Sequence, residues 1–435
     1  MIRRFFFLLS IVAVVLTACS DNDSFSTDKG NVLTFSTDTV KMDTLFSTVP
    51  SRTYHFWAFN KSGDGIRIQS VRLERGNQSG FRVNVDGTYL NPVANNLEVC
   101  KGDSIRVFVE VTTSENHADT PQLEEDNLLF TLESGVIQRV NLRTYSWDVP
   151  MLRNLIVSRD TIIESQKPLV VYDSIVVDSA ATLTLRNTAL YFHSGAGIVV
   201  RGQLEAENCL FRGDRLDRMF DYLPYDRISG QWAGISIYSS SKGCALSNCE
   251  IRNAMNAIQC DSTSLTLTRC MVHNSKGHGV TARNSKVVVS YCQLTNTLGD
   301  CLTLRGGDAV VDHSTLAQFY PFSANRGAAL RFSNTNIGLL LHCSNTLVTG
   351  YESDVVMRQQ KDTLTDVDYH FADCILRTDS VTDPERFERI IWETPKDSVQ
   401  GKQHFKTIDE DKLYYDFTID SISPALPLGI GCLLR

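Results

Sequence analysis

The sequence predicts an all-β protein in which a solenoid of stacked coils follows a separate β-sandwich. The first observation is a side-chain register that returns every 22 residues, so that Ile258, Val280 and Leu302 occupy equivalent positions. A repeat of this length is typical of a solenoid, because one coil cannot bury its apolar face without stacking on the next. The second observation is that apolar residues alternate within each coil, which favours strands over helices. The third is that residues 32–148 lack the register and form a different domain.

The N-terminus has the order of a secretion signal. Arg3 and Arg4 precede an apolar run over residues 5–16, and Leu16-Thr17-Ala18-Cys19 follows. A charged start, an apolar run and small residues before a cleavage point are typical of signal peptides, and this run is too short to cross a bilayer. The last four residues resemble a bacterial lipobox, which implies cleavage after residues 1–18 and attachment of lipid, such as palmitate, to Cys19. An ordinary signal peptide or a membrane helix is the alternative.

Residues 19–31 form a polar tether with too little apolar content to fold. Asp21 and Asp23 lie just behind Cys19. This arrangement resembles the surface-export signal of Bacteroidetes lipoproteins. The resemblance implies a lipid-anchored protein of the outer membrane that faces outward.

Residues 32–148 predict a sandwich of about seven strands. The alternating run Thr53–Asn60 meets a turn at Gly63, and Ile66-Arg67-Ile68 begins the next strand. This pattern resembles bacterial Ig-like domains related to the ASPM, SPD-2 and hydin modules, which implies a role as a spacer or a docking surface.

Residues 149–378 predict the solenoid. The segments 265–274, 287–296 and 309–318 alternate in the same frame, and a second short strand precedes each of them. Three asparagines fall at the turn after the strand and predict a hydrogen-bonded asparagine ladder: Asn253, Asn274 and Asn296.

Cysteines recur at one position of the coil, at Cys249, Cys270 and Cys292, and Cys374 matches them in a later coil. A metal site, disulfides between coils and a stack of buried thiols are the three interpretations. No Cys-x-x-Cys pair with zinc spacing is present, and parallel side chains in register seldom meet the torsion of a disulfide. Buried free thiols are therefore the favoured interpretation.

The repeat resembles the right-handed parallel β-helix of the pectin-lyase-like superfamily, which includes pectate lyases, polygalacturonases and phage tailspikes. The resemblance covers roughly residues 154–377. Residues 379–435 are expected to cap the open end of the solenoid. Within this segment Pro384–Trp392 has a helical pattern, and Tyr415–Leu426 resembles the terminal segment of other bacterial β-helix proteins.

Two residues resemble a catalytic pair of this superfamily. Gly277-His278-Gly279 is similar to the histidine motif of polygalacturonases, and Gly299-Asp300 to their aspartate motif. However, the order of the motifs is reversed, and Cys301 replaces the second aspartate. Glycosidic hydrolysis normally needs two carboxylates, so His278 and Asp300 are better explained as equivalent, solvent-facing turn residues.

An insertion over residues 212–232, which lengthens one coil so that Cys209 and Cys249 lie 40 residues apart, is the preferred candidate for ligand binding. Loops on a rigid scaffold often carry binding sites, and arginine, aspartate and aromatic side chains together suit sugar hydroxyls and sugar rings. The alternative is a salt-bridged flap that packs against the sandwich. The candidate residues are Arg212, Asp214, Arg215, Asp217, Arg218, Tyr222, Tyr225, Asp226, Arg227 and Trp232.

Composition limits the partners. The formal charge of -8 disfavours nucleic acid, because no basic patch is available to displace counterions. No metal or cofactor motif is present. The sequence therefore predicts a surface lipoprotein whose solenoid binds a polysaccharide or another extended ligand. The alternatives are a polysaccharide lyase, a glycoside hydrolase or an epimerase, and a structural or adhesive surface component.

Overall fold

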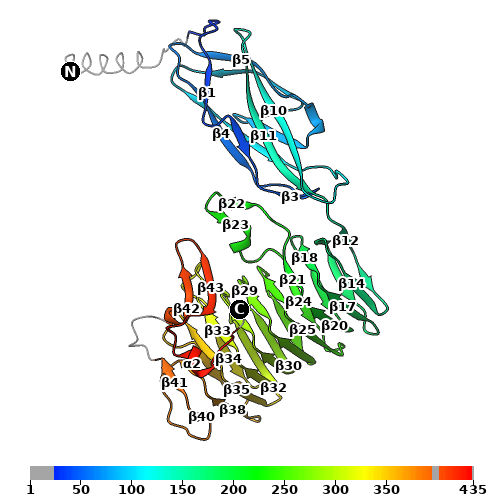
Figure 1. Ribbon diagram of the computed structural model, residues 1–435, viewed down its shortest axis with the longest axis vertical. Helices are drawn as coiled ribbons and strands as arrows, with labels where there is room; N and C mark the ends of the chain where they lie inside the picture. The colour runs from blue at the N-terminus through cyan, green and yellow to red at the C-terminus, as the bar shows by residue number, and fades with distance from the viewer. Residues whose placement is uncertain (1–23, 394–400, 434–435) are drawn as a thin grey trace, which may run out of the picture. The chain divides into compact units, whose positions relative to one another are not determined.

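A computed structural model describes residues 24–393 and 401–433 (Figure 1). The chain divides into two compact units, Met1–Asp148 and Val149–Arg435. The predicted signal peptide and Cys19 lie outside the described residues. Among the residues that are described, no helix is both long and apolar enough to cross a bilayer.

The first unit is a sandwich of two sheets. One sheet has the strand order β1-β4-β9-β6-β7, and the other has β2-β11-β10-β5-β8 with β3 beside β11. The strands are β1 Leu33–Phe35, β2 Thr39–Lys41, β3 Leu45–Phe46, β4 Tyr54–Asn60, β5 Ile66–Leu73, β6 Phe81–Val85, β7 Thr88–Tyr89, β8 Val93–Val99, β9 Ser104–Val111, β10 Gln122–Leu132 and β11 Ile137–Trp147, with a 3-10 turn, η1, at Gly76–Gln78.

Alternation along the strands builds the core of the sandwich. Phe56 of β4 and Val107 of β9 turn inward from one sheet, and Ile68 and Phe130 turn inward from the other. The residues between them face outward, so each sheet has one apolar and one polar face.

The second unit is a parallel solenoid made of two long sheets. One has eleven strands, which are β12 Met151–Arg153, β15 Leu169–Tyr172, β18 Ala189–Phe192, β21 Leu210–Gly213, β26 Glu250–Arg252, β29 Met271–His273, β31 Gln293–Thr295, β33 Thr315–Gln318, β36 Leu347–Gly350, β39 Ile375–Arg377 and β41 Ile391–Glu393.

The other sheet has seventeen strands. They are β13 Ile156–Val157, β14 Thr161–Glu164, β16 Ser174–Val177, β17 Thr182–Arg186, β19 Gly197–Val200, β20 Gln203–Glu207, β24 Gly234–Ile237, β25 Gly243–Ser247, β27 Ile258–Asp261, β28 Ser264–Thr268, β30 Val280–Ser290, β32 Leu302–Asp312, β34 Leu330–Ser333, β35 Leu339–Ser344, β37 Val356–Gln359, β38 Val367–Ala372 and β40 Phe387–Glu388.

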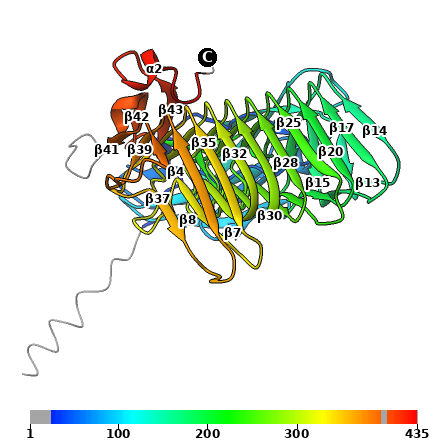
Figure 2. The same ribbon diagram turned by 90° about the horizontal axis from the view of Figure 1, so that it is seen from below.

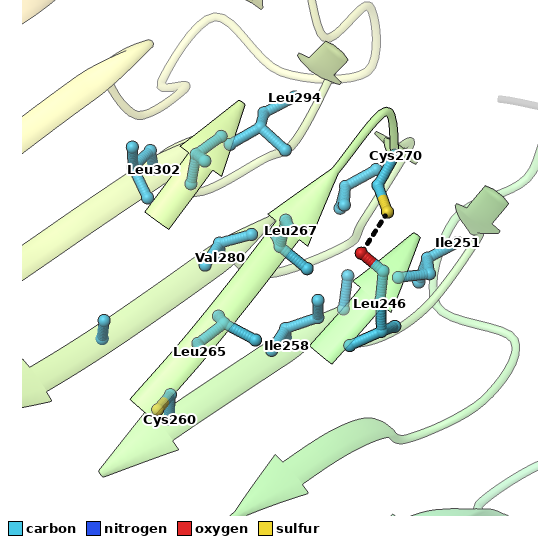
Figure 3. Packing of buried hydrophobic residues seen from close by; sticks show 14 of the residues in the cluster. Leu246, Ile251, Ile258, Cys260, Leu265, Leu267, Cys270, Val280, Leu294 and Leu302 are labelled. Carbon is cyan, nitrogen blue, oxygen red and sulfur yellow. Dashed lines mark hydrogen bonds between the residues drawn. The ribbon is translucent and has the colours of Figure 1, made fainter. Parts of the chain in front are cut away.

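The predicted 22-residue register is confirmed. Ile258 pairs with Val280, and Val280 pairs with Leu302, in parallel strands. In two coils the two predicted short strands are continuous, because β30 and β32 each run through both segments. Side chains of successive coils stack into one apolar core between the sheets (Figure 3).

A column of left-handed residues forms the corner before the eleven-stranded sheet. Nine consecutive strands of this sheet each begin two residues after a non-glycine residue with positive φ, between 43° and 55°. Such a residue turns the chain sharply within one position. The corner residues are Asn187, Asn208, Asn248, Arg269, Tyr291, His313, Asn345, Asp373 and Arg389.

The cysteine series follows this corner and satisfies its backbone. Cys270 Sγ lies 3.4 Å from the carbonyl oxygen of Thr268, two residues earlier, and 3.3 Å from that of Leu246 (Figure 3). The same bond to the carbonyl two residues earlier recurs at Thr188, Cys209, Cys249, Cys292, Ser314, Thr346 and Cys374. The eleven described cysteines are free, and ten are buried. The column therefore needs small side chains that donate a hydrogen bond, and the stacked-thiol interpretation agrees with it.

The predicted asparagine ladder is present in part. Asn253 and Asn274 are buried in left-handed conformation, and the amide of Asn274 donates to the Asn253 side chain at 2.8 Å. Asn296 has the same conformation, but its side-chain oxygen accepts the backbone N–H of Phe319 instead.

The C-terminal segment differs from its prediction. Pro384–Trp392 is not helical, because Phe387 and Trp392 lie in β40 and β41, which add one more coil. Residues 402–432 cover the outer side of the eleven-stranded sheet, where Phe405, Phe417 and Ile419 pack on Leu347 (Figure 2). The elements of this segment are η3 Lys402–His404, β42 Phe405–Asp409, β43 Tyr414–Ile419 and α2 Ala425–Leu428.

A candidate ligand groove on the eleven-stranded sheet

A groove of about 830 Å³ lies on the outer face of the eleven-stranded sheet. Its floor is formed by β21, β26, β29 and β31, which are neighbours in the sheet. One wall is the end of the insertion at Asp226 and Arg227, and the other is the C-terminal segment over residues 413–418. The groove is therefore built where two irregular segments rise from a regular sheet.

The insertion is fixed to the floor by its acidic residue. Asp226 accepts an ion pair from Arg212 at 2.7 Å and another from Arg252 at 3.2 Å. The Asn253 amide donates to the Asp226 carbonyl at 3.0 Å. Asn253, the first residue of the asparagine ladder, therefore also holds this wall of the groove. The hairpin β22 Arg218–Phe220 and β23 Leu223–Pro224 and the 3-10 turn η2 Tyr225–Arg227 lie within the insertion.

The C-terminal wall contacts both the floor and the insertion. Gln293 donates to the Phe417 carbonyl at 3.3 Å, and the Phe417 ring lies 5.9 Å from that of His273. Arg227 hydrogen-bonds the carbonyl of Lys412 and lies 5.6 Å from the Tyr414 ring centre. Arg227 and Tyr414 are 187 residues apart in the sequence. The contacts of Arg227 join the two walls.

The floor combines apolar and charged groups. Met271 is the apolar part of the floor, and its side chain is 38% exposed. The charged part includes Arg252, which forms an ion pair with Glu250 at 3.1 Å. Burial and the nearby Arg252 guanidinium lower the pKa of His273 to about 4, so this imidazole is neutral at pH 7. Its Nδ1 hydrogen-bonds Thr295 at 2.8 Å. Arg269 is exposed at the rim and has no ion pair within the described chain.

The predicted ligand residues of the insertion divide into three groups. Asp226 and Arg227 line the groove. Arg218 and Tyr222 are exposed in and beside the β22–β23 hairpin, and Tyr225 lies under Arg215 at 4.2 Å.

The remaining residues of the set are buried or ion-paired within the fold. Trp232 is only 1% exposed, stacks on Phe192 at 4.3 Å and donates to the Arg252 carbonyl. Asp217 is buried against Arg215, and Arg212 and Asp214 are also buried. The salt-bridged flap proposed as the alternative thus describes much of this segment.

His278 and Asp300, the alternative enzymatic site, lie beside each other, with His278 Nδ1 3.7 Å from the Asp300 carboxylate. Asp300 was expected to face solvent, but it is 3% exposed. Its carboxylate accepts Arg331 Nε at 2.8 Å, the Ala328 N–H at 2.8 Å and the Thr303 hydroxyl at 2.9 Å. These donors outweigh the effect of burial and lower the pKa of Asp300. His278 Nδ1 accepts the Asp300 N–H at 3.0 Å, so the ring is held as a turn residue.

Sequence reasoning missed the floor of the groove and its second wall. Met271, His273 and Gln293 are ordinary outward positions of the repeat, and Tyr414 comes from the distant C-terminal segment. The one sign in the sequence is that these outward positions hold larger side chains than the small polar residues found at other outward positions. Among the described residues, no cluster of three or more potential metal ligands occurs.

The family model described as a right-handed β-helix region matches residues 151–314 and 225–348. The solenoid is a right-handed β-helix. No curated protein matches this chain. The β-helix fold itself carries the groove, whereas its two walls come from segments that interrupt or follow the repeat.

Three solved structures show weak similarity. A family 123 glycoside hydrolase from Clostridium perfringens is 6% identical, and the similarity covers 27% of this chain and 26% of the hydrolase chain, with a TM-score of 0.19. The PapD-like domain 7 of human CEP192 is 9% identical over 31% of this chain and 98% of its own, with a TM-score of 0.19. The CsuC–CsuE chaperone–tip adhesion subunit complex of Acinetobacter baumannii is 17% identical over 28% and 60% of the two chains, with a TM-score of 0.16. TM-scores this low support no argument about function.

Proposed function

We propose that the β-helix binds a carbohydrate chain in this groove without cleaving it. The groove is the observation that carries the proposal. It combines the exposed side chains of Met271 and Tyr414 with the polar groups of Glu250, Arg252 and Gln293. A sugar ring has an apolar face and a rim of hydroxyl groups, so it needs this mixture of contacts.

The dimensions of the groove suit an extended ligand. Its floor spans four neighbouring strands, and three intervals between parallel strands are about 14 Å. Glu250 lies on this floor and Arg269 at its rim. A short stretch of linked sugar rings therefore fits along the axis of the β-helix.

The charges of the groove favour binding over hydrolysis. Asp226 and Glu250 are both ion-paired with Arg252, and Asp226 is also paired with Arg212. A glycosidase needs one carboxylic acid to donate a proton and a second carboxylate to act beside it. Here Asp226 holds the wall to the floor, and Glu250 is paired on the floor itself. The third carboxylate of the lining, Asp416, accepts the Thr418 N–H at 2.9 Å, so each carboxylate serves as an acceptor within the fold.

Binding to a glycan array, followed by calorimetry with the retained glycan, tests the proposal. Met271→Ala and Tyr414→Ala should each weaken binding about tenfold, the loss expected when one stacked contact is removed. Leu340→Ala is the matched control, because Leu340 is 38% exposed on the seventeen-stranded sheet. Unchanged affinity in both groove variants contradicts the groove as the site. Shortened glycan chains favour the lyase or hydrolase alternative, and epimerised sugars in chains of unchanged length favour the epimerase alternative.

We further propose that the protein is a lipid-anchored outer-membrane protein that faces outward, with an Ig-like sandwich as a spacer. The support is the order of Arg3, the apolar run and Cys19, together with the acidic tether. Cys19→Ala should release the protein into the soluble fraction. Retention of this variant in the membrane fraction contradicts lipid anchoring. A protein that retains no glycan favours the structural or adhesive alternative.

A further inference from the structure

Three arginines gather on the outer face of the seventeen-stranded sheet, away from the groove. Arg283 of β30 and Arg305 of β32 are direct partners in the parallel register. Arg331 lies in the next strand, β34, where it pairs with Thr303 of β32. Thr303 is two positions before Arg305. Parallel strands are about 4.8 Å apart, so the three arginines leave the sheet from one small area of this face. β30 and β32 are seen side by side in Figure 2.

The acidic residues around this cluster do not neutralise it. Asp261 is 3.9 Å from Arg283, and Asp300 is 2.8 Å from Arg331. Within the described residues, Arg305 has no hydrogen bond or ion pair from its side chain. Three positive and two negative charges leave one positive charge, which is centred on Arg305.

The neighbouring groups have capacity for a ligand. The Thr281 hydroxyl oxygen is buried beside the cluster and has no hydrogen-bond partner in the described chain. From Arg331, Asp300 accepts a hydrogen bond only from the Nε atom. The two terminal nitrogens of the Arg331 guanidinium group therefore remain available for a ligand. Burial lowers the pKa of His278, and the nearby charges of Arg305 and Arg331 act in the same direction, so that ring lies close to the same cluster.

Like charges at directly opposed positions of a sheet destabilise it. The Arg283–Arg305 pair therefore has a cost that packing does not explain, because both side chains point outward. An oxyanion between the two guanidinium groups removes this repulsion and accepts their paired N–H donors.

We propose that Arg283, Arg305 and Arg331 form an oxyanion site that binds a carboxylate or sulfate group of a glycan. The site is separate from the groove and does not depend on the function proposed for it. Asp300 acts here as a positioning residue, because it orients Arg331. This role explains why a carboxylate that resembles a catalytic one is buried and fully hydrogen-bonded.

The test measures thermal unfolding of the full chain with sodium sulfate, sodium glucuronate, glucose and sodium chloride at matched ionic strength. Both oxyanions should stabilise the wild type beyond chloride, and glucose should not. Arg305→Gln should weaken the apparent affinity for them about tenfold or more, the effect of losing a charge-assisted hydrogen bond. Arg201→Gln is the control, because Arg201 is exposed at the turn between β19 and β20.

The stability of the variants without added oxyanion separates this site from a structural role. Arg305→Gln should be at least as stable as the wild type, since it removes repulsion. A preference for glucuronate supports a carboxylate ligand, and a preference for sulfate supports a sulfate ester. Equal responses of wild type and Arg305→Gln to both oxyanions, or no stabilisation beyond chloride, overturn the proposal.

Discussion

The two sheets of the β-helix have outer faces of different character. The eleven-stranded sheet carries a groove of about 830 Å³ with walls from the insertion and the C-terminal segment. A hollow on the seventeen-stranded sheet measures about 250 Å³ and is lined only by repeated coils, through side chains such as Thr184, Glu205 and Thr266. The repeat alone therefore makes a small hollow, and the segments that break the repeat make a larger one.

The largest expected effect concerns the residue that joins the insertion to the core. Trp232→Ala removes a buried ring that stacks on Phe192, so we expect a loss of about 3–5 kcal/mol in unfolding free energy. Denaturant unfolding of the β-helix measures it. Tyr238→Ala changes a 51% exposed residue just after β24 and should alter stability by less than about 0.5 kcal/mol. Similar losses in both variants would contradict the core role of Trp232.

The corner column predicts which substitutions the repeat accepts. Cys270→Ser keeps a small donor, as Ser314 does naturally two coils later, whereas Cys270→Val leaves two buried carbonyls without this bond. We expect Cys270→Val to lose about 1–3 kcal/mol and Cys270→Ser to lose less. Calorimetric unfolding compares them. A serine variant as unstable as the valine variant would show that the thiol acts by packing alone.

The wall formed by the insertion should loosen without unfolding of the β-helix. Arg252→Gln removes the partner of Asp226 and Glu250, and we expect a global loss of only about 1 kcal/mol because these side chains are partly exposed. Limited proteolysis should cut residues 215–228 faster than in the wild type. Arg201→Gln serves as the control, and equal cleavage rates would contradict the tether.

A smaller, pH-dependent effect is expected at the start of the insertion. The Asp214 carboxylate, 2.6 Å from the His193 ring, raises the pKa of His193. Stability from this pair is therefore complete below the unfolded pKa, about 6.5, and is lost as pH rises through the higher folded value. The wild type should exceed His193→Gln in stability more at about pH 5.5 than at about pH 8. A difference that grows with pH would contradict the sign.

The repeat could be predicted from the sequence, whereas the site could only be predicted in part. Ile258, Val280 and Leu302 are related by a constant spacing, and spacing is what fixes parallel pairing. The groove depends on the meeting of Arg227 with Tyr414, which no local pattern records. Trp232 was assigned to a ligand surface because aromatic residues suit both cores and sugars, and only packing separates the two.

The most direct test of the groove is hydrogen exchange of the β-helix with and without a glycan retained on the array. We expect slower exchange in β26, β29 and β31 and in residues 413–418, with no change in β17, β20, β25 and β28. Slower exchange confined to the seventeen-stranded sheet, or none on either sheet, would contradict binding in the groove.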